Sequence, residues 1–321
     1  MTALADAVRA GDRRSLARAI TLAESTRPDH RDEAAALLDE LMAATGGATR
    51  VGISGAPGAG KSTFIEALGL TLVDAGHEVA VLAVDPSSTR GGGSILGDKT
   101  RMEQLSRSPG AFIRPSPSKG TLGGVARRTR EAMLLCEAAG FDVVLVETVG
   151  VGQSEVAVAG MVDVFLLLLA PGAGDELQGV KRGIVELADL VVVNKADGAL
   201  ADLARHTASD YGHALHLLRP RTDGWEARVL SCSARLGEGI EAVWAVVDEY
   251  TAAANATGSL GLRRGEQARE WMWSEVSETL LERLRTDERV QEDLGALEAN
   301  VVAGRTSPTA AAQLLLERFS H

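Results

Sequence analysis

A glycine-rich segment at residues 55–62 constrains the fold of this chain more than any other feature. It fits the spacing Gly, four residues, Gly-Lys-Ser, and it lies between an apolar run at 51–53 and a helical pattern at 62–73. A strand, this loop and a helix together make a phosphate loop. There the backbone N–H groups face an anion, the Lys61 ammonium neutralises it and the Ser62 hydroxyl reaches a magnesium ion. The sequence therefore predicts a nucleotide-binding protein.

The residues of this loop are expected to surround the phosphates. They are Gly55, Ala56, Pro57, Gly58, Ala59, Gly60, Lys61, Ser62 and Thr63.

A second motif, Asn194-Lys195-Ala-Asp197, predicts which base the nucleotide carries. It directly follows an apolar strand pattern, where GTPases place their base-recognition residues. A carboxylate such as that of Asp197 accepts two hydrogen bonds from guanine N1–H and the exocyclic amine, whereas adenine offers no such pair of donors. Asn194 is expected to bridge the base and the phosphate loop, and Lys195 to lie along the ring. Ser233 and Ala234 resemble the loop whose backbone N–H contacts guanine O6.

Strand and helix patterns alternate from residue 50 to about residue 253. The expected strands lie near 51–54, 78–84, 142–147, 162–169, 189–194 and 227–232. Their apolar runs lack a clear alternation, which indicates burial on both faces of a sheet. The predicted fold class is therefore α/β, with a doubly wound, mostly parallel sheet and helical extensions at both ends of the chain.

The chain is expected to have three parts. Residues 1–48 form an N-terminal helical extension with helices at 4–22 and 31–44, residues 49–256 form the nucleotide-binding domain, and residues 257–321 form a C-terminal helical segment. A break at 257–262 separates the last two parts.

An apolar stripe runs along the helical pattern at 266–285. It consists of Met272, Val276, Leu280 and Leu284, with Trp271 and Trp273 beside it. Such a stripe commonly packs on its own domain. Two tryptophans in a chain that is only 3% aromatic favour a subunit contact instead, and thus a homodimer.

Carboxylates near the phosphate loop predict a divalent cation, Mg²⁺. Glu147 and Gly150 stand where a GTPase usually carries Asp-x-x-Gly, so the carboxylate holds magnesium and the glycine N–H senses the γ-phosphate. Asp85 ends an expected strand and Asp98 follows in a glycine-rich loop. Asp85 could instead be only a helix cap.

Two further candidates for catalysis lie in neighbouring loops. Gln153 is a candidate for positioning water. Lys181 follows a strand end and is expected near the site, although a solvated helix charge is the alternative.

Composition limits the partners and the compartment. The net charge is -11 and no basic stripe carries interleaved aromatic residues, which argues against a nucleic-acid partner. Cys136 and Cys232 are far apart and fit reduced core residues of a cytoplasmic protein. The longest apolar run is too short to span a membrane, and acidic residues interrupt the N-terminal arginines, unlike a transit peptide.

Across nearly its whole length the chain resembles the MeaB/ArgK family of GTPases, which includes the methylmalonic aciduria type A proteins. The motifs that carry the resemblance lie at 55–63, 84–88, 97–102, 114–117, 123–126, 147–154 and 171–179. The resemblance implies a phosphate-loop NTPase of the SIMIBI type.

The family resemblance also implies a function. It implies a homodimeric GTPase that binds GTP and GDP, serves as a chaperone of adenosylcobalamin-dependent methylmalonyl-CoA mutase or a related acyl-CoA mutase, and couples GTP hydrolysis to cofactor delivery. Asp85, Asp98 and Glu147 match the family's magnesium and switch carboxylates, and Lys181 falls in its third switch. Cobalamin itself would be bound by the partners.

Water is expected to attack the γ-phosphate in line, with Lys61, magnesium and the loop amides stabilising the charge that develops. No arginine finger can be assigned, so slow basal hydrolysis that a partner accelerates is expected.

Three other classes compete with this interpretation. A nickel-insertion GTPase would normally carry a His or Cys cluster, whereas the six histidines here are scattered. A small-molecule kinase would rarely use the guanine motif, although the sequence does not exclude an acceptor pocket. A partitioning ATPase carries a second lysine beside the first glycine of its loop, where this chain has Ala56.

Overall fold

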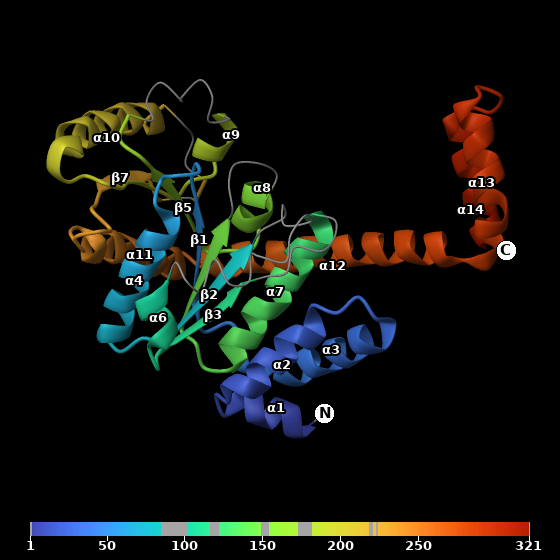
Figure 1. Cartoon of the computed structure of the whole chain (residues 1–321), viewed down its shortest axis with the longest axis horizontal. Helices are drawn as coiled ribbons and strands as arrows, with labels where there is room; N and C mark the ends of the chain where they lie inside the picture. Colours follow the sequence, from blue (N-terminus) through green and yellow to red (C-terminus); the bar gives the residue numbers. More distant parts are fainter. Residues whose placement is uncertain are drawn as a thin grey trace. The chain divides into compact units, whose positions relative to one another are not determined.

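Seven parallel strands form the sheet at the centre of the chain's first structural unit, Met1–Gln267 (Figure 1). The computed structural model describes residues 2–84, 102–115, 122–148, 154–172, 182–217, 221–222 and 224–320. The strands are β1 Thr49–Ser54, β2 Val79–Val84, β3 Ala111–Pro115, β4 Val143–Thr148, β5 Val164–Leu169, β6 Leu190–Val193 and β7 Arg228–Ser231. Their order is β3-β2-β4-β1-β5-β6-β7, and every neighbouring pair is parallel. The predicted α/β fold is confirmed.

Six of these strands match the expected ones, and β3 was missed. Among the described strands it pairs only with β2, and its residues alternate between buried and half-buried. It also contains Arg114 and Pro115, and proline is tolerated in a sheet chiefly at such an edge. A five-residue edge strand that ends in proline therefore lacks the continuous apolar run by which the central strands were found.

Helices cover both faces of the sheet. On one face α4 Lys61–Asp74, α6 Glu103–Arg107 and α11 Ile240–Ala256 share one apolar core with the strands. On the other face lie α7 Leu122–Ala138 and α8 Ser154–Ala159. The short α9 Arg182–Val185 precedes β6. After β6 come the 3₁₀ turn η4 Gly198–Leu200 and α10 Ala201–Leu215, which packs on β6 and β7. Burial from both sides accounts for the uninterrupted apolar runs of the central strands.

The N-terminal segment forms three helices where two were expected. α1 Thr2–Arg9 and α2 Arg13–Ala23 replace the single helix expected at 4–22. Gly11, with φ of 75°, breaks the chain between them, and the Asp12 carboxylate caps α2 by accepting from Ser15 N at 2.8 Å. α3 Pro28–Leu41 runs into the 3₁₀ turn η1 Met42–Ala44. All three helices pack around α7, outside the sheet (Figure 1).

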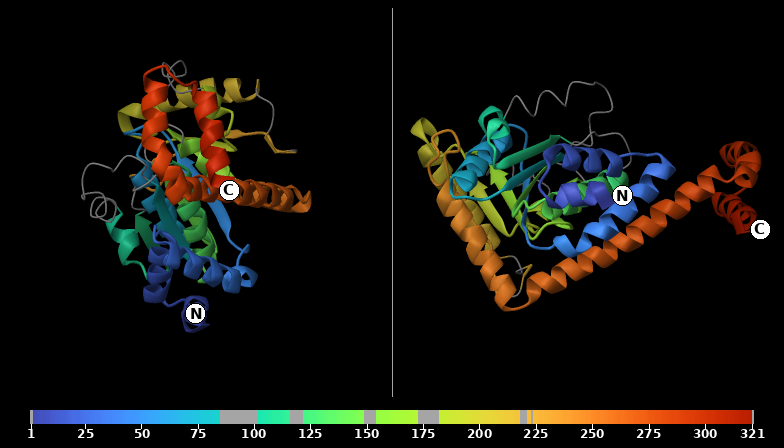
Figure 2. Two further views of the ribbon diagram at one scale, coloured as in Figure 1. Left: turned by 90° about the vertical axis from the view of Figure 1, so that its right-hand side faces the viewer. Right: turned by 90° about the horizontal axis from the view of Figure 1, so that it is seen from below.

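The second structural unit, Ala268–His321, is helical. α12 Ser259–Thr286 begins in the first unit and continues into the second, so the expected break at 257–262 is confined to the turn before Ser259. α13 Glu288–Val302 and α14 Pro308–Ser320 pack side by side (Figure 2). None of the helices in the described ranges is both long and apolar enough to cross a bilayer.

The first turns of α12 are held on the N-terminal edge of the sheet by a buried carboxylate. Asp163, just before β5, accepts from Arg264 Nε at 2.8 Å and Nη2 at 2.6 Å, and from Arg50 N in β1 at 2.9 Å. A buried carboxylate needs this many donors to offset its lost hydration. The start of α12 is thereby anchored to the base of the two strands β1 and β5.

Candidate nucleotide site

The phosphate loop connects the C-terminal end of β1 to the first turn of α4. Gly60 is the N-cap of α4 with φ of 91°, and a Cβ placed there would lie 2.6 Å from Asn194 Nδ2. Only glycine combines that backbone conformation with so close a neighbour. Ala59 is buried under the loop, while Pro57 and Gly58 are exposed, as is Thr63 in the first turn of α4. The glycine-rich loop thus leads directly into the N-terminus of α4, which is where a helix favours an anion.

Lys61 is folded back onto the loop that it is expected to serve. Its Nζ donates to Gly55 O at 2.7 Å and to Ala56 O at 3.3 Å, and its side chain is buried. Burial lowers the pKa of the Lys61 ammonium, although the carboxylates of Glu147 and Glu155 act in the opposite direction. A desolvated cation of this kind gains strongly from a phosphate placed beside it.

Ser62 and Glu147 are brought together from separate elements. Ser62 Oγ, in α4, donates to Glu147 Oε1, near the end of β4, at 3.1 Å. The strand register places Glu147 opposite Ile53, just before the phosphate loop. A hydroxyl and a carboxylate oxygen in contact are the ligand types that Mg²⁺ prefers. Among the residues that the structure describes, no cluster of three or more His, Cys, Asp or Glu could hold a metal. Of the four residues that the sequence predicts as magnesium ligands, Ser62 and Glu147 are the two that the structure describes.

Asn194 connects the phosphate loop to the predicted base-binding loops. Its Nδ2 donates to Ala59 O at 3.0 Å, and its Oδ1 accepts from Ala234 N at 3.0 Å. Cys232 Sγ approaches the same Oδ1 at 3.6 Å. The buried amide is thus satisfied at both ends, which fixes the loops at 55–60 and 233–234 relative to each other.

The residues predicted to recognise the base lie at the ends of β6 and β7. Ser233 Oγ donates to Asp197 Oδ2, and Arg235 Nε lies 3.8 Å from the same oxygen. Lys195 has a positive φ, 57°, the one non-glycine case in the described ranges, and its Nζ donates to Gly58 O at 2.7 Å. A left-handed backbone costs a non-glycine residue roughly 1–2 kcal/mol, so the surrounding contacts must hold Lys195 in place. Asp197 thus lies against Ser233, while Lys195 of the same motif contacts the phosphate loop.

Five of the predicted site residues lie outside the described residues. These are Asp85, Asp98, Gly150, Gln153 and Lys181.

Sequence reasoning missed a buried carboxylate beside the site. Glu155, in the first turn of α8, is fully buried, and its charge raises the pKa of Lys61. Glu155 directly follows the family motif at 147–154, and this position was the one signal in the sequence that could have drawn attention to it. Two buried carboxylates, Glu147 and Glu155, therefore offset part of the cost of burying the Lys61 charge.

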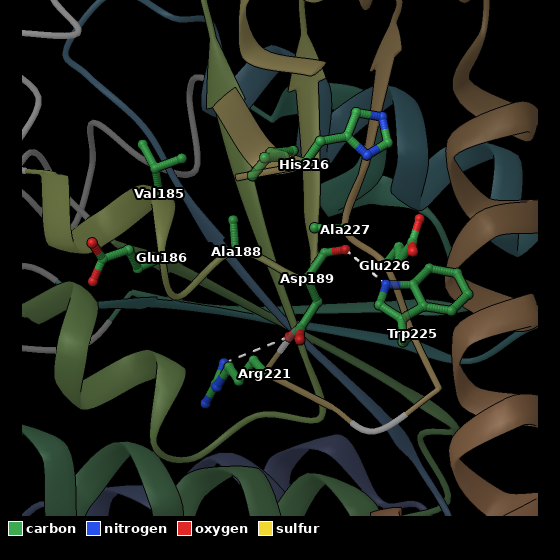
Figure 3. Close-up of a pocket in the computed structure, with 10 residues that line it drawn as sticks. Val185, Glu186, Ala188, Asp189, His216, Arg221, Trp225, Glu226 and Ala227 are labelled. Atoms are coloured by element: carbon green, nitrogen blue, oxygen red, sulfur yellow. Dashed lines mark hydrogen bonds and ion pairs between the residues drawn. The ribbon is translucent and has the colours of Figure 1, made fainter. Parts of the chain in front are cut away.

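A separate cavity of about 200 Å³ lies at the opposite edge of the sheet, where β6 and β7 begin (Figure 3). Arg221 and Trp225 point toward Asp189 there, with Arg221 Nη1 3.6 Å from Asp189 Oδ2 and Trp225 Nε1 donating to Asp189 O at 3.0 Å. Arg263 Nη1 lies 3.5 Å from the same carboxylate. None of the site residues that the structure describes lines this cavity, and Asp189 is paired with Arg221 and Arg263.

Comparison with known proteins identifies the family to which this chain belongs. The family model described as methylmalonyl Co-A mutase-associated GTPase MeaB matches residues 16–289. The GTPase ArgK of Escherichia coli is 49% identical, over 93% of this chain and 92% of its own length. The mitochondrial methylmalonic aciduria type A homolog of Mus musculus is 51% identical, over 96% of this chain and 77% of its own length.

A solved structure agrees with the sequence relatives. The crystal structure of a LAO/AO transport system kinase is 40% identical, with a TM-score of 0.78 over 100% of this chain and 97% of that one. Three observations agree on the family. The family model matches most of the chain, the relatives are named GTPases, and the chain carries a phosphate loop together with a guanine motif. This chain therefore belongs to the MeaB family of methylmalonyl-CoA mutase-associated GTPases.

Proposed function

We propose that this GTPase assists the loading of adenosylcobalamin into methylmalonyl-CoA mutase, or into a related acyl-CoA mutase, and protects that enzyme. The observation that carries the proposal is the match of residues 16–289 to a family described as associated with this mutase. The name of the mouse relative, a methylmalonic aciduria type A homolog, supports the same partner. Cobalamin would be held by the mutase and not by this chain.

The proposed nucleotide pose follows from the contacts between the loops. The Asp197 carboxylate accepts from guanine, Lys195 lies along the base, and the Ala234 region faces guanine O6. The phosphates then occupy the loop before α4, where Lys61 exchanges its carbonyl partners for phosphate oxygens. Because Asn194 joins the two halves of the site, base and phosphates are bound as one unit.

Magnesium is proposed to bind at Ser62 and Glu147, with Asp85 and Asp98 as the further candidate carboxylates. The contact of Ser62 Oγ with Glu147 Oε1 supports this assignment, since both groups are hard oxygen ligands. When bound, the ion would offset negative charge on the β- and γ-phosphate oxygens. Glu147 orients Ser62, and Lys61 with the loop amides stabilises the charge of the in-line transition state.

The expected result with the partner is faster hydrolysis. Phosphate release from GTP should be slow for the purified protein alone and several-fold faster with stoichiometric adenosylcobalamin-dependent methylmalonyl-CoA mutase, because binding of a partner can complete the set of catalytic groups. Steady-state assays with and without the mutase, with Lys61→Ala as the inactive control, measure this.

An unchanged rate would leave the GTPase intact and exclude this mutase as the activating partner. Related acyl-CoA mutases would then be assayed in the same way. Transfer of the γ-phosphate to a small molecule in place of water would instead support the kinase alternative.

We also propose that the chain is a homodimer through α12. Leu280, Val276, Met272, Trp273 and Leu281 form an apolar surface on this helix in the second unit, each 39–60% exposed. Leu284 and Trp271 of the predicted stripe are half-buried. Large apolar and tryptophan side chains that remain exposed in a single chain are typical of interfaces.

Charging this surface should separate the subunits. We expect Val276→Glu/Leu280→Glu to halve the mass measured by light scattering, because two carboxylates would be buried unpaired in the interface. The control Ser274→Glu adds charge to the same helix at an exposed polar position and should leave the mass unchanged. A double variant that keeps the dimeric mass would show that the contact lies elsewhere.

A further inference from the structure

Two buried hydroxyl groups lie at the ends of the strands that lead into the site. Thr148 Oγ1 donates to Ser54 Oγ at 3.0 Å, and both residues are 0% exposed. Ser54 is the last residue of β1, directly before Gly55 of the phosphate loop. Thr148 is the last residue of β4, directly after Glu147. The bond thus joins the start of the phosphate loop to the segment that carries the proposed magnesium carboxylate.

This bond and the Ser62–Glu147 bond lie on opposite faces of the sheet. Successive side chains of a strand alternate between faces, so Glu147 and Thr148 point in opposite directions. Ile53, the register partner of Glu147, packs in the core shared with α4, whereas a Cβ at Gly52, on the Ser54 side, would contact Val158 of α8. The end of β4 is therefore hydrogen-bonded to the segment around the phosphate loop on both faces of the sheet.

We propose that Ser54 and Thr148 are a positioning pair for GTP hydrolysis. Their hydrogen bond fixes the end of β4 against β1, and so holds the Glu147 carboxylate at the Ser62 hydroxyl. The proposal rests on the proposed role of Glu147. Neither residue is among the proposed nucleotide contacts, so both would act on the reaction through Glu147 and the loop.

Burial makes the hydrogen bond between Thr148 and Ser54 important for positioning. Water has no access to either hydroxyl, so a broken bond is not replaced by one to solvent. Catalysis of phosphoryl transfer depends almost entirely on positioning and on preorganised charge, and small displacements of the participating groups lower the rate strongly. Loss of the bond should therefore affect the transition state more than the ground-state binding of GTP.

The test compares Thr148→Val, Ser54→Ala, their double variant and Thr148→Ser. We expect kcat for GTP hydrolysis to fall about tenfold in Thr148→Val and Ser54→Ala, with the Kd for GTP changed by less than about twofold. The double variant should be no slower than the single ones, because each change removes the same bond. Thr148→Ser keeps the hydroxyl and should retain the wild-type kcat.

Melting temperatures separate positioning from simple destabilisation. Each single variant leaves one buried hydroxyl unpaired, whereas the double variant removes both, so its melting temperature should recover toward that of the wild type. A kcat that recovers together with the melting temperature would overturn the proposal, as would single variants with a kcat within about twofold of the wild type. Thr129→Val removes a buried hydroxyl that donates to Val125 O within α7 and belongs to none of the predicted site residues, so it is the matched control for kcat.

The variant Glu147→Gln distinguishes this inference from the function on which it rests. If Glu147→Gln hydrolyses GTP as fast as the wild type, the role of Glu147 fails and the positioning proposal fails with it. If Glu147→Gln is slow but Thr148→Val is fast, only the pair is excluded.

Discussion

Replacement of Lys61 by Ala should weaken GTP binding about a hundredfold. The Lys61 ammonium is buried, and among the described residues its acceptors are the backbone carbonyls Gly55 O and Ala56 O. Exchange of these neutral acceptors for phosphate oxygens yields charge-assisted hydrogen bonds worth up to about 3 kcal/mol, which corresponds to about a hundredfold in Kd. Fluorescence titration with a labelled GTP analogue measures the change directly.

The same substitution should leave the empty protein stable. Burial lowers the pKa of Lys61, which means that the folded, nucleotide-free protein holds this charge at a cost. Lys61→Ala should therefore melt within a few degrees of the wild type without nucleotide, but should lose the stabilisation that saturating GTP gives the wild type. Arg14→Ala removes the same charge from the exposed face of α2 and should keep both properties. Unchanged GTP affinity in Lys61→Ala would show that the nucleotide binds elsewhere.

The sequence predicted the sheet well because burial on both faces leaves a clear signal. Strands such as β2 and β5 are apolar at every position, and the phosphate loop orients the elements on either side of it. The sequence pattern failed to predict the secondary structure where that structure depends on only a few residues. Gly11 and Asp12 divide an otherwise continuous amphipathic pattern into α1 and α2, and β3 is a short edge strand. In each case a single turn or a single edge position determines the secondary structure. Hydrophobic periodicity is averaged over many residues and does not show such a local change.

The candidate site was predicted less completely than the fold. Motifs made Ser62, Glu147 and Asp197 candidates, because phosphate and guanine chemistry require particular residue types at fixed spacing. The residues that support these candidates need no particular residue type at a fixed spacing. Ser54, Thr148 and Glu155 act through burial and strand register, which become visible only when β1, β4 and α8 are assembled. Register pairs residues about a hundred positions apart, and local sequence patterns do not report it.

Asp197→Asn should change the preferred base from guanine to xanthine. In the proposed pose the Asp197 carboxylate accepts from guanine N1–H and from its 2-amino group. An asparagine amide offers one acceptor and one donor, so its NH₂ group would face the 2-amino group of guanine without an acceptor between them. Xanthine carries a carbonyl at that position and keeps N1–H, so it complements the amide at both atoms.

The size of this effect follows from the surroundings of Asp197. Its side chain is only 15% exposed and one oxygen already accepts from Ser233 Oγ, so the carboxylate has little freedom to turn away. Sites built to hydrogen-bond a substrate reject analogues that leave buried polar groups unpaired by about 10⁴–10⁵-fold at most. We expect GTP affinity to fall by about 10³-fold and xanthosine triphosphate to become the tighter ligand.

Competition binding of GTP and xanthosine triphosphate, followed by hydrolysis assays with each, tests this change. Asp202→Asn is the matched control, since it makes the same substitution at an exposed carboxylate in the first turn of α10. It should keep the preference for GTP. If Asp197→Asn binds GTP as the wild type does, this carboxylate does not read the base. If both nucleotides bind weakly while the melting temperature is unchanged, Asp197 contacts the ligand but not through the N1 and C2 positions.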